Sequence, residues 1–150
     1  MLQGHGDDGY RYGTKIIADF STNVWYGGEP AGLKDYVFGR WQKINRYPEV
    51  LGESLREKIA AHHHLPPGQV MVCSGTTESI YLIAQLFSGK RTTIVSPTFS
   101  EYEDACLAFG HEIVQLNWGD ALDQPRLKSD LLFLCNPHNA TRLYYDELQY

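Results

Sequence analysis

The chain has 150 residues, a length that suits one compact domain; 43% of them are hydrophobic and 21% are charged. This composition is ordinary for a folded protein and excludes the disordered and fibrous classes. Lys and Arg together number 13 against 18 Asp and Glu, which gives a net charge of −5. That charge argues against a general binder of nucleic acid or of anionic membranes.

The cysteines and the chain start indicate the cellular compartment. Cys73, Cys106 and Cys135 are far apart, and an odd number without a CxxC pair favours a reducing, cytoplasmic interior over a disulfide framework. Residues 1–13 contain no apolar stretch that suits a signal peptide. No apolar run approaches the roughly 20 residues that cross a bilayer. We therefore expect a soluble cytoplasmic protein without membrane or nucleic-acid partners.

The first half of the chain predicts an arm followed by two helices. Residues 1–13 have little apolar content, and a short apolar run follows at 16–20. From Pro30 the apolar residues recur at helical spacing: Leu33, Val37, Trp41 and Ile44. The sequence Arg46-Tyr47-Pro48 interrupts this pattern, because the residue before a proline avoids the α conformation. A second helix is predicted within 51–65, with Leu51, Leu55 and Ile59 on one face.

The remaining chain alternates apolar strands with helices. Strands are predicted at 70–73, 92–96, 113–116 and 131–135, and helices at 76–87 and 99–109. Continuous apolar strands that alternate with helices indicate a buried, mainly parallel sheet. We therefore predict an α/β fold, a three-layer α/β/α sandwich with a mainly parallel sheet. The neighbouring residues His62, His63 and His64 cannot share one helix face, so we expect no metal site.

A loop follows the predicted strand at 70–73, at the edge of the sheet where parallel α/β proteins bind ligands. It reads Ser74-Gly75-Thr76-Thr77-Glu78 and opens a helix. Free backbone N–H groups, two hydroxyls and the positive end of the helix dipole suit a phosphate group. The same residues also fit a plain helix cap.

Two further loops follow the strands at 92–96 and 131–135. Tyr102, in the first turn of a predicted helix, can stack on a flat ligand ring, or it can continue the core stripe that Phe99 begins. Asn136 can donate an amide hydrogen bond to a ligand oxygen, or it can belong to an ordinary turn.

In this order, the segments SGTTESI (74–80), SPTFSEY (96–102) and CNPHNAT (135–141) resemble the fold-type I pyridoxal-phosphate (PLP) enzymes of the class I/II aminotransferase family. Within that family, DFSTN (19–23) and NRYPE (45–49) are similar to the branch of threonine-phosphate decarboxylase and histidinol-phosphate aminotransferase. The opening His5-Gly6 favours the decarboxylase. The resemblance extends from about residue 5 to residue 141.

The resemblance implies pyridoxal 5'-phosphate as the cofactor and gives five residues a part in binding it. Gly75, Thr76 and Thr77 would hold the cofactor phosphate. Tyr102 would stack on the pyridine ring, and Asn136 would hydrogen-bond the phenolic oxygen.

Three further residues would serve the neighbouring subunit or the substrate. Tyr47 would reach the cofactor phosphate of the neighbouring subunit, which implies a homodimer with shared active sites. Asn23 would meet the carboxylate of a phosphorylated amino-acid substrate, and His5 would help to bind the substrate phosphate. The third loop departs from the family pattern NPNNPTG at three positions: His138, Ala140 and Arg142.

The resemblance also implies that no catalytic residue falls in this chain, because the family's Schiff-base lysine would lie beyond position 150. We expect a piece of a longer enzyme that is inactive alone, with 1–45 as an N-terminal arm and small-domain helix and 46–150 as the first part of the large PLP-binding domain. The implied activity is decarboxylation of L-threonine O-3-phosphate to aminopropanol phosphate, for cobalamin biosynthesis. The alternatives are histidinol-phosphate or other class I/II aminotransfer, and a non-catalytic binding module.

Overall fold

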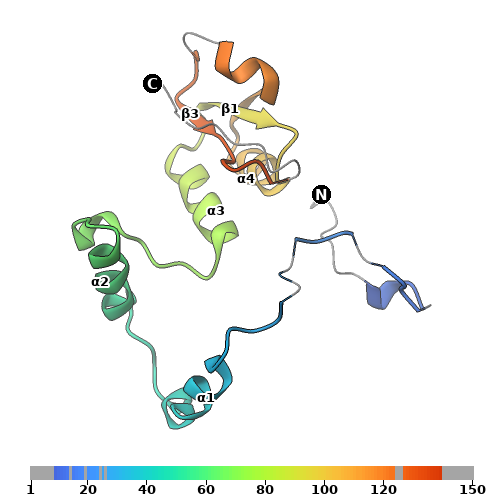
Figure 1. Ribbon diagram of the computed structural model, residues 1–150. Coiled ribbons are helices and arrows are strands. Elements are labelled where there is room, and N and C mark those ends of the chain that lie inside the picture. The colour runs from blue at the N-terminus through green and yellow to red at the C-terminus, as the bar shows by residue number, and fades with distance from the viewer. Residues whose placement is uncertain are drawn as a thin grey trace. The chain divides into compact units, whose positions relative to one another are not determined.

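The computed structural model describes residues 9–13, 15–18, 20–23, 25, 27–123 and 127–139. The chain forms two compact units, Gly4–Val72 and Cys73–Tyr150 with Met1–Gln3 (Figure 1). The predicted functional division between residues 45 and 46 concerns a longer enzyme and stays a prediction. In the part of the chain described here, no helix is both long and apolar enough to cross a membrane.

The unit Gly4–Val72 contains short helices joined by extended segments. After a 3-10 turn at Gly9–Arg11, α1 spans Leu33–Phe38 and a second 3-10 turn, η2, spans Trp41–Asn45. The helical pattern of the sequence is therefore broken at Gly39, whose N–H still bonds to the Asp35 carbonyl at 2.8 Å. Glycine is a poor helix former, so the chain tightens there into 3-10 geometry. The helical segment ends before Pro48, as predicted, and Arg46 is already extended.

The second predicted helix of this unit is confirmed as α2, Glu53–His62. Two carboxylates accept N–H groups at its start: Glu49 from Ser54 at 2.6 Å and Glu53 from Leu51 at 3.2 Å. The hydrogen bond from Ser54 lowers the pKa of Glu49 below its ordinary value, since it favours the charged carboxylate. The helix is followed by a short 3-10 turn at Pro67–Gln69.

The other unit contains a three-stranded parallel sheet flanked by helices. Its elements in chain order are α3 Thr76–Leu86, β1 Arg91–Ser96, α4 Glu101–Ala108, β2 Glu112–Asn117, the 3-10 helix η4 Trp118–Asp123 and β3 Leu131–Phe133. The strand order is β2-β1-β3. Strand β1 pairs in parallel with both neighbours, with Ile94 opposite Gln115 on one side and Phe133 on the other. The predicted parallel α/β architecture is confirmed.

One predicted strand is wrong. Residues 70–73 form no strand, since none of the three described strands pairs with them. Their apolar side chains fit a strand, but a strand also needs the backbone hydrogen bonds of a neighbour.

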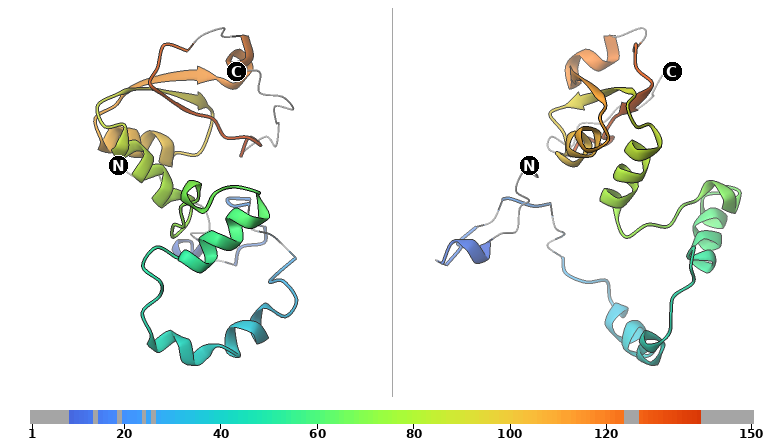
Figure 2. Two further views of the ribbon diagram at one scale, coloured as in Figure 1. Left: turned by 90° about the vertical axis from the view of Figure 1, so that its left-hand side faces the viewer. Right: turned by 180° about the vertical axis from the view of Figure 1, so that it is seen from behind.

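The core of this unit lies between the sheet and the helices α3 and α4. Its buried side chains come from both helices and from two strands: Ile80, Ala84, Ile94, Ala105, Cys106 and Phe133. The predicted helix at 76–87 is confirmed as α3, which buries Ile80 and Ala84, whereas Ile83 is 36% exposed. Figures 1 and 2 show η4 on the opposite side of the sheet from α3 and α4. Helices therefore cover both faces of β1, which explains why Thr92–Val95 are all buried.

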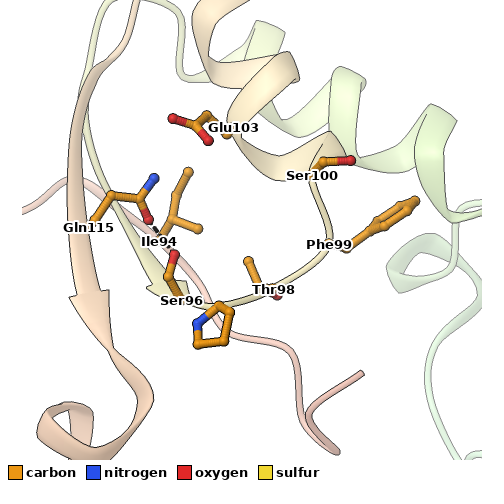
Figure 3. Close-up of a pocket in the computed structure, with 8 residues that line it drawn as sticks. Ile94, Ser96, Thr98, Phe99, Ser100, Glu103 and Gln115 are labelled. Atoms are coloured by element: carbon orange, nitrogen blue, oxygen red, sulfur yellow. Dashed lines mark hydrogen bonds between the residues drawn. The ribbon is translucent and has the colours of Figure 1, made fainter. Parts of the chain in front are cut away.

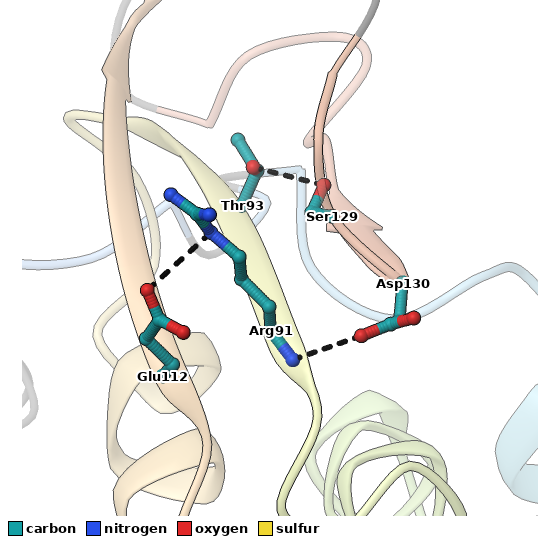
Figure 4. A network of polar contacts seen from close by, with 5 residues as sticks. All are labelled: Arg91, Thr93, Glu112, Ser129 and Asp130. Carbon is teal, nitrogen blue, oxygen red and sulfur yellow. Dashed lines mark hydrogen bonds and ion pairs between the residues drawn. The ribbon is translucent and has the colours of Figure 1, made fainter.

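A polar network fixes the amino ends of the three strands (Figure 4). The Asp130 carboxylate accepts the Arg91 N–H at 3.1 Å, and the Asp130 N–H donates to the Arg91 carbonyl at 2.8 Å. On the other side, the Arg91 guanidinium lies 3.5 Å from the Glu112 carboxylate. The Thr93 hydroxyl donates to Ser129 at 3.0 Å. These contacts lie beside the first paired residues of β1 with β2 and β3, at the edge opposite the predicted site.

A buried histidine joins α3 to the sheet. His111, just before β2, has its Nε2 2.8 Å from the Ala84 carbonyl oxygen and its Nδ1 2.7 Å from the Thr92 hydroxyl. A carbonyl oxygen only accepts hydrogen bonds, so Nε2 carries the proton that is donated to Ala84. In the neutral ring, Nδ1 then accepts the hydroxyl proton of Thr92. Both polar atoms of the ring are satisfied, as burial requires.

Candidate functional site

The topology brings the predicted cofactor residues to one edge of the sheet. Only residues 87–90 connect α3 to β1, so the C-terminus of α3 lies at the amino end of β1. The 11-residue helix is about 16 Å long, which places its first turn toward the carboxyl end of the strands. The loops after β1 and β3 leave from that same edge, where parallel α/β sheets bind ligands. Gly75, Tyr102 and Asn136 thus share one edge.

The start of α3 offers backbone N–H groups that no side chain caps. Gly75 is the N-cap residue, with φ 103° and ψ 168°, and makes no side-chain cap hydrogen bond. Thr76 and Thr77 are exposed at the first turn. The Glu78 carboxylate reaches back to the Ser74 N–H at 2.5 Å, so part of the plain capping interpretation is also realised. An anion at this helix start would meet free N–H groups and the positive end of the dipole.

Tyr102 lies in the first turn of α4 and is half-buried. Its ring stacks on Phe133 of β3, with centroids 4.9 Å apart and planes at 23°, and meets Phe99 edge-on at 6.3 Å. Burial raises the pKa of Tyr102 above its ordinary value, and the neighbouring Cys135 thiol adds to this shift. The core-packing interpretation of Tyr102 is therefore realised on one ring face. Stacking on a cofactor would use the other face and stays a prediction.

The loop after β3 carries Asn136, which is exposed. Residues Cys135 and Pro137 flank it, and the Cys135 thiol donates to the Pro137 carbonyl at 3.3 Å. Since Tyr102 neighbours Cys135, the structure brings the Tyr102 and Asn136 segments together. A second exposed amide, Asn139, lies three residues further along the same loop. The sequence interpretation gave Asn139 no role, although its amide offers the same chemistry.

A polar hollow of about 210 Å³ lies at the same edge, between β1, β2 and the start of α4 (Figure 3). Its lining is Ile94, Ser96, Pro97, Thr98, Phe99, Ser100, Glu103 and Gln115. The Ser96 hydroxyl donates to the Gln115 amide oxygen across it. None of the residues with a role predicted from the sequence lines this hollow. A bound group here would meet hydroxyls and a carboxylate rather than a cationic side chain.

The remaining predicted site residues fall in the unit Gly4–Val72. Tyr47 is fully exposed and lines an open hollow of about 640 Å³ together with Lys43, Arg46 and Glu49. The two cations beside the phenol give this hollow a partly basic lining. Asn23 is exposed and makes a polar or ring contact. His5 lies outside the described residues.

The part of the chain that the structure describes has no cluster of metal-ligating side chains, and its three cysteines form no disulfide. No three His, Cys, Asp or Glu side chains there are grouped to hold a metal ion. Cys73, Cys106 and Cys135 are all free. Cys106 is fully buried, and burial raises the pKa of its thiol, while the nearby Thr92 hydroxyl acts in the opposite direction.

The chain matches a known protein family along most of its length. The model of the family described as "Aminotransferase class I and II" matches residues 19–149. Threonine-phosphate decarboxylase of Salmonella typhimurium is 32% identical over 136 residues, which cover 85% of this chain and 37% of that protein. Histidinol-phosphate aminotransferase of a Geobacillus species is 30% identical over 146 residues, which cover 89% of this chain and 39% of that protein.

Solved structures of a decarboxylase and an aminotransferase also match this chain. The crystal structure of L-threonine-O-3-phosphate decarboxylase from Porphyromonas gingivalis matches with a TM-score of 0.74 and 34% identity, over 79% of this chain and 38% of that chain. An aminotransferase from Mycobacterium tuberculosis matches with a TM-score of 0.66 and 20% identity, over 81% and 36% of the two chains, and supports the fold alone. The chain thus spans less than two fifths of the length of these relatives.

Proposed function

Because this chain belongs to the class I and II aminotransferase family, whose enzymes depend on pyridoxal 5'-phosphate, we propose that it forms part of a longer PLP enzyme that decarboxylates L-threonine O-3-phosphate. One observation carries the choice of reaction. The decarboxylase structure is 34% identical with a TM-score of 0.74, whereas the aminotransferase structure is 20% identical with a TM-score of 0.66. The curated relatives point the same way by a smaller margin, 32% against 30%.

The start of α3 supports the proposed cofactor, because its donors fit a phosphate group. The backbone N–H groups after Gly75 and the hydroxyls of Thr76 and Thr77 are the donors, and all three residues are exposed. An ideal Cβ on Gly75 would have no heavy atom within 4 Å, so the space beside this glycine is open. A dianionic phosphate placed there would be held by several N–H and O–H donors and by the helix dipole.

The cofactor ring would be held by side chains from the two neighbouring loops. The face of the Tyr102 ring opposite Phe133 would pack on the pyridine ring, and Asn136 would donate its amide N–H to the phenolic oxygen. When bound, PLP withdraws electrons from whichever bond to the substrate Cα stands perpendicular to its ring. Breaking the bond from Cα to the carboxylate releases carbon dioxide, and Cα takes up a proton to give aminopropanol phosphate.

The substrate and the second subunit would be bound by residues of the unit Gly4–Val72. We assign Tyr47 to the cofactor phosphate of a neighbouring subunit, in a homodimer with shared active sites. Lys43 and Arg46 beside it supply positive charge, which favours this assignment. Asn23 would meet the substrate carboxylate, and His5 would help to bind the substrate phosphate. By holding both anionic groups, these residues would choose which Cα bond stands perpendicular to the ring.

The test is an assay of the full-length enzyme that contains this chain. We expect a yellow protein that loses its colour with a carbonyl reagent and that releases carbon dioxide from L-threonine O-3-phosphate without a keto acid. If the enzyme releases no carbon dioxide and instead transfers the amino group of histidinol phosphate to a keto acid, it is an aminotransferase and the proposed decarboxylation is wrong. A colourless protein that takes up no pyridoxal phosphate would overturn the enzyme assignment and leave a binding module.

A further inference from the structure

The side chain of His138 contacts the loops that follow all three strands. His138 belongs to the loop after β3 and is 2% exposed. Its Nε2 hydrogen-bonds the carbonyl oxygen of Pro97, directly after β1, so this nitrogen carries the donated proton. Its ring also packs on Trp118, directly after β2, with centroids 4.7 Å apart and planes tilted by 50°. One imidazole therefore joins the segments that follow the three strands, at the carboxyl edge of the sheet.

The loop after β3 depends on this contact because the strand ends early. The register of β1 with β3 stops at Ile94 opposite Phe133, while β1 continues to Ser96 beside β2. Within the described residues 134–139, the loop therefore has no ladder of backbone hydrogen bonds to β1. The hydrogen bond from His138 to Pro97 is a link between these two loops just beyond the last paired residues.

The position of this link connects the two residues proposed to hold the cofactor ring. His138 lies two residues after Asn136, and Pro97 lies five residues before Tyr102. We propose that His138 is a positioning residue, which holds the loop after β3 against the loops after β1 and β2 and so sets where the Asn136 amide lies relative to Tyr102. The part of this inference that concerns the cofactor rests on the proposed function. The part that concerns loop order does not.

Three variants of the full-length enzyme separate the contributions. His138→Phe keeps a flat ring against Trp118 but loses the N–H donor, and His138→Gln keeps a donor near the Nε2 position but loses the ring. His111→Phe is the matched control, since His111 is also buried and hydrogen-bonded to a carbonyl but lies at the amino end of β2. Hydrogen exchange of the cofactor-free protein is measured for residues 134–139, followed by the dissociation constant and absorption maximum with pyridoxal phosphate.

We expect amide exchange within residues 134–139 to be at least tenfold faster in His138→Phe and less affected in His138→Gln, with β1 unchanged. We also expect about tenfold weaker pyridoxal phosphate binding and a shifted absorption maximum in His138→Phe, but neither change in His111→Phe.

Amide exchange at the wild-type rate in both His138 variants would overturn the proposal. Faster exchange with unchanged cofactor affinity and spectrum would also overturn it. If His138→Phe does not fold, His138→Leu, which also lacks the N–H donor, takes its place in the same exchange measurement. A wild-type enzyme that takes up no pyridoxal phosphate would instead refute the proposed function, while exchange would still decide whether His138 orders the loop.

Discussion

The ring of Tyr102 in α4 lies stacked on the ring of Phe133 in β3, with centroids 4.9 Å apart. This pair joins the first turn of a helix at the candidate site to the buried core of the sheet. A ligand that stacks on Tyr102 would therefore contact a ring whose opposite face is already packed against Phe133. Preorganisation of this kind reduces the entropy lost on binding.

Truncating Tyr102 is expected to lower the free energy of unfolding. Tyr102→Ala removes the stack on Phe133 and should reduce the free energy of unfolding by about 2–3 kcal/mol, less than for a fully buried aromatic ring. Tyr102→Phe keeps the stack and should cost less than about 1 kcal/mol. Urea unfolding measures both values, and equal losses in the two variants would contradict the importance of the ring.

The raised pKa of Tyr102 predicts a loss of stability in alkali. Burial favours the neutral phenol, so the folded protein holds its proton to higher pH than the unfolded chain, whose tyrosines titrate near pH 10. The stability that depends on this group is fully present below about pH 10 and declines as the pH rises toward the folded value. Unfolding measured at several pH values above 9 should show a shallower decline for Tyr102→Phe. Parallel curves for the two proteins would show that Tyr102 makes no such contribution.

The sequence predicted the parallel sheet because short apolar runs alternate with helical segments, as is typical where helices cover a sheet. Strand β1 shows this most directly, since Thr92–Val95 lie under helices on both sides. The helices α3 and α4 were also predicted, and each buries two side chains in the core: Ile80 and Ala84 in α3, Ala105 and Cys106 in α4. These patterns are local consequences of burial and can be read from one sequence.

The errors and omissions have tertiary causes. The segment 70–73 has the residues of a strand, but pairing depends on a neighbour that no local pattern reveals. Tyr102 carried two possible roles, and its stack on Phe133 depends on β3, some 30 residues away. His138 was noticed only as a departure from a motif, because its contacts with Pro97 and Trp118 lie far away in sequence.

The hydrogen bonds of His111 are expected to be coupled. His111→Leu leaves the Ala84 carbonyl and the Thr92 hydroxyl without this partner, which should cost about 2–3 kcal/mol of unfolding free energy. Thr92→Val removes the hydroxyl with little change of shape and should cost about 1–2 kcal/mol. Because the two side chains share a hydrogen bond, the double variant should lose less than the sum of the single losses. Strict additivity in urea unfolding would contradict the shared bond.

The three thiols should differ in their reaction with an alkylating agent. Cys106 is fully buried and its pKa is raised by that burial, so its reactive thiolate is both rare and inaccessible in the folded protein. Cys73 and Cys135 are partly exposed. Mass spectrometry after a short exposure to iodoacetamide at pH 8 should show Cys73 and Cys135 labelled well before Cys106, and all three labelled at similar rates in urea. Early labelling of Cys106 without denaturant would show that the core around it opens readily.

Gly75→Ala tests the proposed phosphate site through the backbone. Gly75 has φ 103° and ψ 168°, a region that essentially only glycine adopts, so alanine should cost about 1–3 kcal/mol of strain or move the backbone. Because an added Cβ has no neighbour within 4 Å, strain rather than collision is the cause. A loss of about 1.4 kcal/mol at the site corresponds to tenfold weaker binding of pyridoxal phosphate.

Gly89→Ala is the matched control, since Gly89 also has a positive φ, 71°, and no neighbour within 4 Å, but follows the C-terminus of α3. It should lower stability by about 1–2 kcal/mol and leave cofactor affinity unchanged. Equal cofactor affinity in the two folded variants would indicate that the start of α3 does not hold the phosphate.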